Sequence, residues 1–142
     1  MGGRPDVSML EPVEDGDIVF RVIRADAYQA QSPPGSRIQI SALQTKECEP
    51  APTNYGASVF AATRLADDIA TLFAAMPKWR TYPTAKVPVL EVRKLGVDVR
   101  FSPDDCDMPE LRSAHASIIG ITRQNRPSVI RLLERYLLAP GS

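Results

Sequence analysis

The chain has 142 residues, of which 44% are hydrophobic and 24% charged, and its 17 basic and 17 acidic residues cancel to a formal net charge of zero. This length is typical of one globular domain that buries a core without disulfides or metals. The neutral balance gives no overall attraction to nucleic acid or anionic lipid, and no apolar run approaches the roughly 20 residues that cross a bilayer. We therefore expect a soluble, cytoplasmic protein without membrane or nucleic-acid partners.

The two ends of the chain are predicted to lie outside the folded domain. Residues 1–17 combine glycines, prolines and acidic residues without an apolar period, and they lack the basic start and apolar stretch of a secretory signal. We expect a flexible arm over 1–17, one domain over 18–139 and a short tail over 140–142. Cys48 and Cys106 form no C-x-x-C pair, so neither structural zinc nor a cytosolic disulfide is expected.

The first half of the domain is predicted to contain short strands. Residues 18–23 are rich in β-branched side chains without alternation, which indicates a strand buried on both faces. After a Pro-Pro-Gly turn within 31–36, residues 37–41 alternate polar and apolar, as half-buried strands do. Residues 45–54 are predicted to be a loop, and 57–60 a short strand.

A helix is predicted over residues 65–76. Apolar side chains recur there at helical spacing, at Leu65, Ile69, Leu72, Phe73 and Met76. Thr63 is a suitable N-cap, and Pro77 ends the helix. This is the strongest local pattern in the chain.

The second half mixes strands and helices. Residues 87–92 are predicted to be a strand near a sheet edge, because Pro88 lacks the backbone N–H of a central strand. Residues 97–101 alternate strictly and predict a strand with one buried face.

The C-terminal third is predicted to contain two more helices and one strand. Asp107 and Glu110 resemble a capping pair for a short helix over 108–114. Residues 118–121 indicate a buried strand, and Pro127 suits the first turn of a final helix. The whole pattern predicts an α+β fold with a mostly antiparallel sheet of about five or six strands covered by two main helices.

Residues that could carry chemistry are few. His115 is the only histidine and the one side chain that titrates near neutrality, so it is a candidate general base; a structural role in the core is the alternative. The acidic run around Asp104, Asp105 and Asp107 could hold a divalent cation, although a solvated loop that caps a helix fits its spacing better. The same carboxylates should keep Cys106 protonated.

Arginines and the single tryptophan are candidates for binding. Arg21, Arg24 and Arg37 lie in or beside predicted strands, where they could bind an anion or simply extend from the rim of the sheet. Trp79 either covers the edge of the core or anchors a partner. The chain has no glycine-rich phosphate loop and no dinucleotide fingerprint, so no cofactor is expected.

Four arginines gather in and before the last helix, at Arg123, Arg126, Arg131 and Arg135. A surface for an acidic partner or nucleic acid is one interpretation. A solvated helix face is the other, and the neutral net charge favours it.

Three segments resemble a loose group of small uncharacterised bacterial proteins. These are RIQISAL at 37–43, GASVF at 56–60, and LGVDVRFSPD at 95–104 followed by AHASIIG at 114–120. The group has S-A-F, S-V, L-G-L-x-V and H-A-x-I-x-G segments, and Leu43 stands where it often has phenylalanine. The resemblance implies a bacterial origin and no established activity. It draws attention to Ser41, Ser58 and His115, which fall within the shared segments.

Two functional hypotheses follow. The first is a non-enzymatic binding or accessory module that acts through a protein partner, such as one encoded nearby, by its sheet edge or last helix. The second is a small enzyme for a nucleotide or other anionic substrate, with Arg21 or Arg37 binding the anion, Ser41 or Ser58 orienting it and His115 transferring a proton. That arrangement would be similar to ADP-ribosyl-transferring folds, with Glu91 as the acidic residue.

Overall fold

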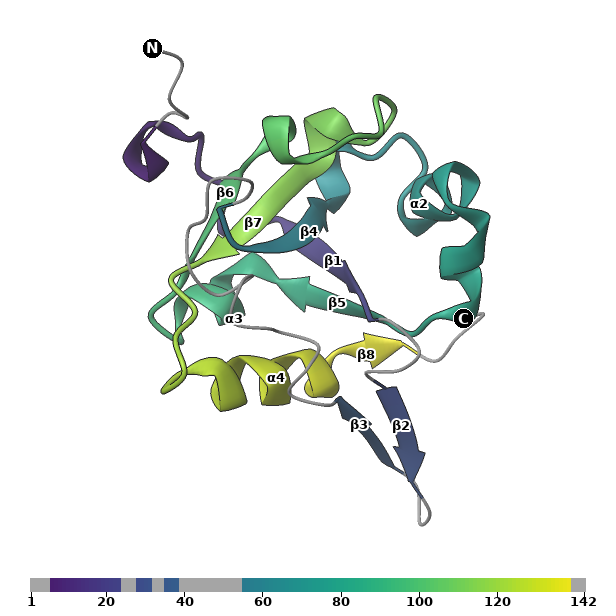
Figure 1. The fold of residues 1–142 in the computed structure, drawn as a ribbon, viewed down its shortest axis with the longest axis vertical. Coiled ribbons are helices and arrows are strands. Elements are labelled where there is room, and N and C mark those ends of the chain that lie inside the picture. Colours follow the sequence, from purple (N-terminus) through teal and green to yellow (C-terminus); the bar gives the residue numbers. More distant parts are fainter. Residues whose placement is uncertain (1–5, 24–27, 32–34, 39–54, 139–142) are drawn as a thin grey trace.

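A six-stranded antiparallel sheet forms the centre of the molecule (Figure 1). The computed structural model describes residues 6–23, 28–31, 35–38 and 55–138. The strand order is β6-β7-β4-β1-β5-β8, and every neighbouring pair is antiparallel. The strands are β1 (Ile18–Val22), β4 (Ala57–Ala61), β5 (Thr84–Pro88), β6 (Asp98–Phe101), β7 (His115–Ile119) and β8 (Leu137–Leu138). A separate hairpin joins β2 (Tyr28–Gln31) to β3 (Gly35–Ile38).

In the described part of the chain, three α-helices accompany the sheet: α2 (Ile69–Ala75), α3 (Val89–Arg93) and α4 (Arg126–Arg135). Short 3-10 helices are η1 (Val7–Met9), η4 (Ala62–Arg64), η5 (Pro77–Thr81), η6 (Pro103–Asp105) and η7 (Arg112–Ala114). Figure 1 shows α2 apart from α3 and α4. The predicted α+β class with a mostly antiparallel sheet is confirmed. Within the described part of the chain, no helix has the length and hydrophobicity needed to cross a membrane.

Both faces of the sheet are buried, and each has its own hydrophobic core. On the α3/α4 face, Val19 and Val59 pack with Val92 and Leu133. On the opposite face, which we call the α2 face, the core contains Phe20, Phe60, Leu65, Leu72, Phe73, Cys106, Leu111 and Ala114. Successive residues of a strand point to opposite faces, so neighbours such as Val19 and Phe20 serve different cores. The prediction that β1 is buried on both faces is confirmed.

The helix predicted over 65–76 is shorter than its pattern suggested. α2 begins only at Ile69, because the chain turns at Asp68, whose φ is +53°. Thr63 does not cap a helix; its hydroxyl donates to the Asp17 carboxylate at 2.6 Å. The predicted apolar stripe still faces a core, since Leu65 and Leu72 are both buried.

The segment predicted as a strand over 87–92 changes conformation at Pro88. β5 occupies Thr84–Pro88 and α3 follows at once. Val89 and Val92 are three residues apart, so one helical turn directs both into the α3/α4 face. From Val89 on, the apolar residues follow the period of a helix and not that of a strand. The prediction of one strand over 87–92 was therefore wrong.

The segment before His115 also differs from its prediction. Instead of a helix over 108–114 it contains turns and η7, with single i→i−3 bonds that end at Leu111 and Ala114. β7 begins at His115, three residues before the predicted strand, and pairs with β4 on one side and β6 on the other. His115 therefore lies on a central strand.

Residues 11–17, expected to belong to a flexible arm, pack against the sheet. The Val13 amide donates to the Val99 carbonyl at 3.0 Å, and the Phe101 amide donates to the Glu11 carbonyl at 2.8 Å. Val13 is 1% exposed. These bonds cover the free edge of β6, which would otherwise present unpaired backbone groups.

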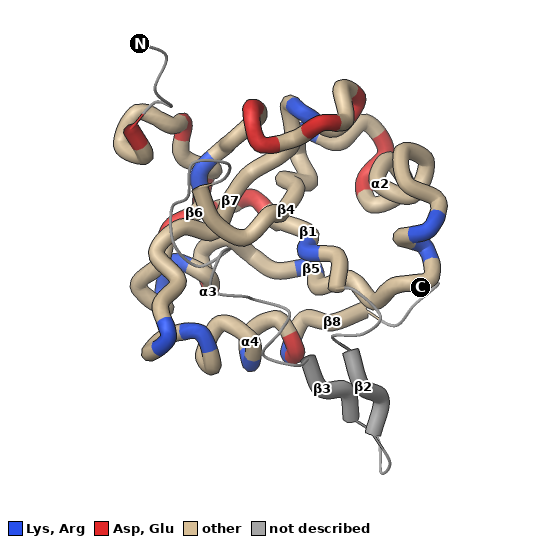
Figure 2. Tube along the Cα trace, in the orientation of Figure 1, with Lys and Arg blue, Asp and Glu red and all other residues tan. Residues whose placement is uncertain are grey.

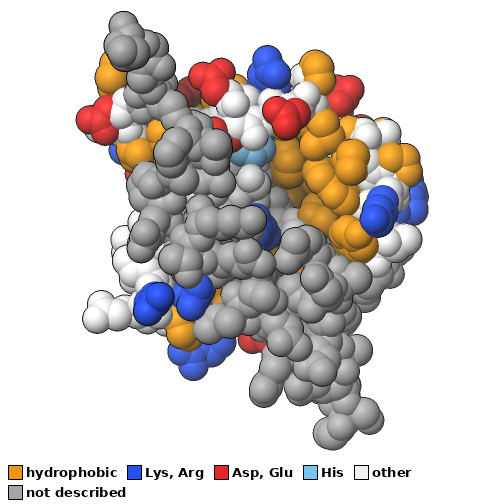
Figure 3. All heavy atoms as spheres, viewed as in Figure 1, with side chains coloured by type: hydrophobic (Ala, Val, Ile, Leu, Met, Phe, Trp, Pro, Cys, Tyr) orange, Lys and Arg blue, Asp and Glu red, His pale blue; other side chains and the backbone are white. Residues whose placement is uncertain are grey.

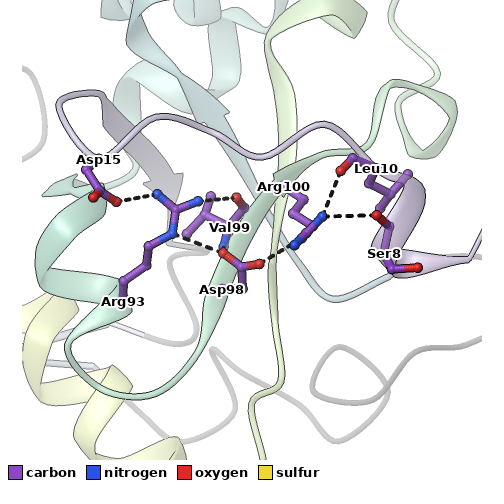
Figure 4. A network of polar contacts seen from close by, with 7 residues as sticks. All are labelled: Ser8, Leu10, Asp15, Arg93, Asp98, Val99 and Arg100. Carbon is purple, nitrogen blue, oxygen red and sulfur yellow. Dashed lines mark hydrogen bonds and ion pairs between the residues drawn. The ribbon is translucent and has the colours of Figure 1, made fainter.

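Ion pairs reinforce this attachment (Figure 4). Arg93 on α3 bridges Asp15 at 2.7 Å and Asp98 at 3.0 Å. Asp98 also binds Arg100 at 2.7 Å, and Arg100 donates to the Leu10 carbonyl at 2.9 Å. Burial raises the pKa of the Asp98 carboxyl, but the hydrogen bonds it accepts outweigh this and hold it below its usual value.

Candidate functional site

His115 and Ser58 meet on the α2 face of the sheet. In the register of β4 with β7, Phe60 lies opposite His115 and Ser58 lies opposite Ser117. The side chains of all four residues share one face, because they are two residues apart along each strand. Ser58 is half-buried, whereas His115 is 3% exposed.

The hydrogen bonds of His115 determine its tautomer. Nδ1 lies 2.9 Å from the Ser102 carbonyl oxygen, which can only accept, so Nδ1 carries the proton. In the neutral ring Nε2 is then an acceptor, and the Ser58 hydroxyl at 3.1 Å donates to it. The Ser58 hydroxyl therefore donates to the imidazole, and the imidazole donates to the Ser102 carbonyl.

Burial lowers the pKa of His115, while the bond to Ser102 and the charge of Asp105 raise it less strongly. The imidazole is therefore neutral at pH 7. A neutral imidazole with a free Nε2 lone pair can accept a proton from Ser58.

Two further serines extend this arrangement into the core. The Ser102 hydroxyl lies 3.1 Å from Nδ1 of His115 and 2.7 Å from the Ser117 hydroxyl. Ser102 and Ser117 are 1% and 0% exposed. No sequence pattern singled out either serine. Ser117 could have been inferred because residues 115 and 117 share a face once β7 is recognised, whereas Ser102 requires the pairing of β6 with β7.

Arg21 joins the group through the backbone. Its Nη1 donates to the carbonyl oxygen of Ser58 at 3.0 Å. Arg21 nevertheless lies on the opposite, α3/α4 face of the sheet, because it follows Phe20 on β1, so only Ser58 and His115 of these three residues share a site. Arg37 lies on β3 of the separate hairpin, and its side chain is outside the described atoms. Ser41, Arg24 and Cys48 also lie outside the described residues.

An aromatic row continues from His115 to Trp79. The Phe60 ring meets the His115 ring edge-on at 5.4 Å and the Trp79 ring at 5.7 Å. Trp79 is half-buried against the α2-face core. It thus covers the edge of the core, which is one of the two roles predicted for it.

The acidic loop has a structural partner. The Asp105 carboxylate accepts the Tyr55 amide at 2.9 Å. Burial, followed by the charges of Asp107 and Glu110, raises the pKa of the Cys106 thiol and keeps it protonated, although burial rather than the carboxylates is the larger cause. Among the described residues, no group of three or more His, Cys, Asp or Glu side chains is placed to hold a metal.

Glu91 does not join the site. It lies on α3, which packs on the α3/α4 face, and its carboxylate binds Lys94 at 2.9 Å. The suggestion that Glu91 supplies the acidic residue of an ADP-ribosyl-transferring arrangement is therefore wrong.

A polar recess of about 370 Å³ lies where the N-terminal segment meets η4. Its lining includes Glu11, Asp17, Arg64 and Phe101. Arg64 stacks over the Phe101 ring at 3.6 Å and binds Glu11 at 2.8 Å. Its cation is thus already neutralised, and Phe101 points to the face opposite His115.

The last helix presents exposed arginines. Arg131 and Arg135 are one turn apart on α4, and Arg123 precedes the helix. All three are exposed, and none makes an ion pair within the part of the chain that the structure describes. Figure 2 shows basic positions concentrated along α4, whereas acidic positions gather around η6 and the start of α2.

In comparisons with protein-family models, curated proteins and solved structures, nothing matches this chain.

Proposed function

We propose that this protein is a binding module that docks an acidic protein partner through α4. The docking surface is the arginine face, defined as Arg123, Arg131 and Arg135. The observation that carries the proposal is that these exposed arginines gather on and just before one helix without ion-pair partners in the described regions, while Arg64, Arg93 and Arg100 elsewhere are all paired. Exposed arginines without counter-charges are available to carboxylates of another molecule.

The helix that carries this face is firmly held. Val129, Ile130, Leu132 and Leu133 of α4 are all buried in the α3/α4-face core. Guanidinium groups on such a helix are presented from a fixed backbone, which reduces the ordering cost of binding. Arginine also binds carboxylates through two parallel hydrogen bonds, so it gives more orientation than lysine.

The charge distribution supports an oriented encounter. Although the formal net charge is zero, basic positions follow α4, where Glu134 is the one acidic residue, and acidic positions gather around η6 and the start of α2 (Figure 2). Such separation orients an approaching acidic surface toward α4 and repels it elsewhere. A protein partner fits better than nucleic acid, since a neutral molecule lacks the overall attraction to a polyanion.

The test is co-purification of the tagged chain with the products of neighbouring genes. In the face variant, Arg123, Arg131 and Arg135 are changed to glutamate. In the control variant, the exposed Lys78, Arg80 and Lys86 are changed to glutamate, which alters net charge by the same amount elsewhere. We expect the face variant to lose at least about tenfold in affinity and the control to bind as the wild type does, with binding weakened by added salt.

Equal loss in both variants, or none in either, contradicts the proposal. Tight binding of duplex DNA that the face variant alone loses would assign the surface to nucleic acid instead. Circular dichroism spectra of all three proteins verify that the folds are the same.

The enzyme hypothesis remains a second candidate, because one observation favours it. Ser58 and His115 are hydrogen-bonded and Arg21 binds the backbone at Ser58.

A further inference from the structure

We propose that Ser58 is a nucleophile that accepts an acyl group from an ester with an apolar acyl portion, and that His115 is its general base. This activity is independent of partner docking through α4. Three features support this assignment: the tautomer of His115, the partial exposure of Ser58 and the apolar side chains beside them.

The three groups have the relative placement of an activated nucleophile. The Ser58 hydroxyl donates to Nε2 of His115 at 3.1 Å, and Nδ1 donates to the Ser102 carbonyl at 2.9 Å. A nucleophile bonded to a base that a third group orients is the arrangement that activates serine in hydrolases of unrelated folds. Here a backbone carbonyl holds the ring and the tautomer in place of a carboxylate.

Among the serines of this network only Ser58 is not fully buried. Ser102 and Ser117 are 1% and 0% exposed, whereas Ser58 is half-buried. Ser58 is also the serine bonded to Nε2, the ring nitrogen that carries no proton.

The chemical step balances with water as the second reactant. Ser58 Oγ attacks the ester carbonyl carbon and forms a C–O bond while its proton moves to Nε2 of His115. The bond to the leaving alcohol then breaks, and that oxygen takes the proton from Nε2. Water, deprotonated by the same nitrogen, releases the acid and restores the Ser58 hydroxyl. The imidazolium that forms in each half is stabilised by the Ser102 carbonyl and by the charge of Asp105.

The surroundings indicate an apolar acyl group. Phe60 contacts the rings of both His115 and Trp79, and Trp79 is half-buried. Val22 and Ile69 are also partly buried against this core. Figure 3 shows hydrophobic side chains gathered on this side of the molecule beside α2. An aromatic or aliphatic group has apolar surface to contact there.

The probe is phenylmethanesulfonyl fluoride, whose aromatic group suits this environment and whose sulfur bonds to an activated serine oxygen with loss of fluoride. Intact mass should show one adduct, and peptide mapping should place it on Ser58. We expect no adduct in Ser58→Ala and at least about a 100-fold slower reaction in His115→Gln. Ser117→Ala is the matched control, because it alters the same network but leaves both bonds of the His115 ring nitrogens to Ser58 and the Ser102 carbonyl.

The pH dependence of labelling in the wild type provides a test that no variant can confound by misfolding. With His115 as the base, the rate should reach a plateau by pH 7, because its pKa lies below the ordinary value. A rate that keeps rising with hydroxide, an adduct at another serine, or no reaction above that of the urea-unfolded chain would overturn the proposal.

Discussion

The burial of His115 makes the stability of the fold depend on pH. The ring is 3% exposed, and desolvation lowers its folded-state pKa below the value near 6.5 that it has in an unfolded chain. Above that value the ring is neutral in both states. Below it the unfolded chain binds a proton that the folded chain does not, so acid favours unfolding.

We therefore expect the free energy of unfolding to fall as the pH drops below about 6.5, by up to about 1.4 kcal/mol per pH unit until the folded-state pKa is reached. Urea unfolding at pH 7.5, 6.5 and 5.5 measures this slope. His115→Gln should be less stable at pH 7.5 but should show a flatter profile over the same interval. Identical slopes in both proteins would assign the pH dependence to other groups.

At the level of single elements, the N-terminal segment acts as an additional edge of the sheet. Glu11 and Val13 exchange backbone hydrogen bonds with β6. Arg93 and Arg100 bind the same segment at Asp15 and at the Leu10 carbonyl. The ion pair of Arg93 with the exposed Asp15 contributes little, as surface pairs usually do. The buried Val13 side chain should contribute more.

Val13→Ala should lower the free energy of unfolding by about 2 kcal/mol, because it removes buried methyl groups and leaves a cavity in the α3/α4-face core. Met9→Ala is the matched control, since Met9 is 76% exposed and should cost close to nothing. Urea denaturation of both variants measures the difference. A loss as large in Met9→Ala would show that the segment is held by its exposed turn rather than by Val13.

Some elements were predictable because their signal is local. β1, β4, β6 and α4 follow from runs of β-branched residues, alternation and an apolar helical stripe. The prediction of Thr63 as an N-cap was wrong, because its hydroxyl donates to the carboxylate of Asp17, which lies 46 residues away in the chain. The change from strand to helix at Pro88 was not predicted, because Val87, Val89 and Val92 suit a strand and a helix equally well. Only packing against a core decides between the two.

For the whole molecule, one sheet shared by two cores implies cooperative unfolding. β1 and β4 are central strands with neighbours on both sides, whereas β8 has only two residues and one neighbour. The same central strands carry one core on each face, so loss of one core removes support from the strands on which the other core packs.

Native-state hydrogen exchange should therefore be slowest at the ladder amides of β1, β4 and β7, with opening free energies close to that of global unfolding. Amides of η1 and β8 should exchange faster by local opening. Mass spectrometry of peptides or NMR measures these rates. Fast exchange in β4 with slow exchange in β5 would mean that the two cores open separately.

The sequence by itself determined the fold class, the strands and the helix whose patterns are local, and the residue types able to act at a site. It also drew attention to Ser58, His115 and Arg21 separately. The tertiary structure decided that Ser58 and His115 meet on one face, because the register of β4 with β7 brings them within hydrogen-bonding distance, whereas Arg21 reaches only the backbone of Ser58. It likewise decided that Arg123, Arg131 and Arg135, which the sequence already placed in and before the last helix, are exposed and make no ion pair with the described residues, since exposure and pairing depend on how folding arranges the chain.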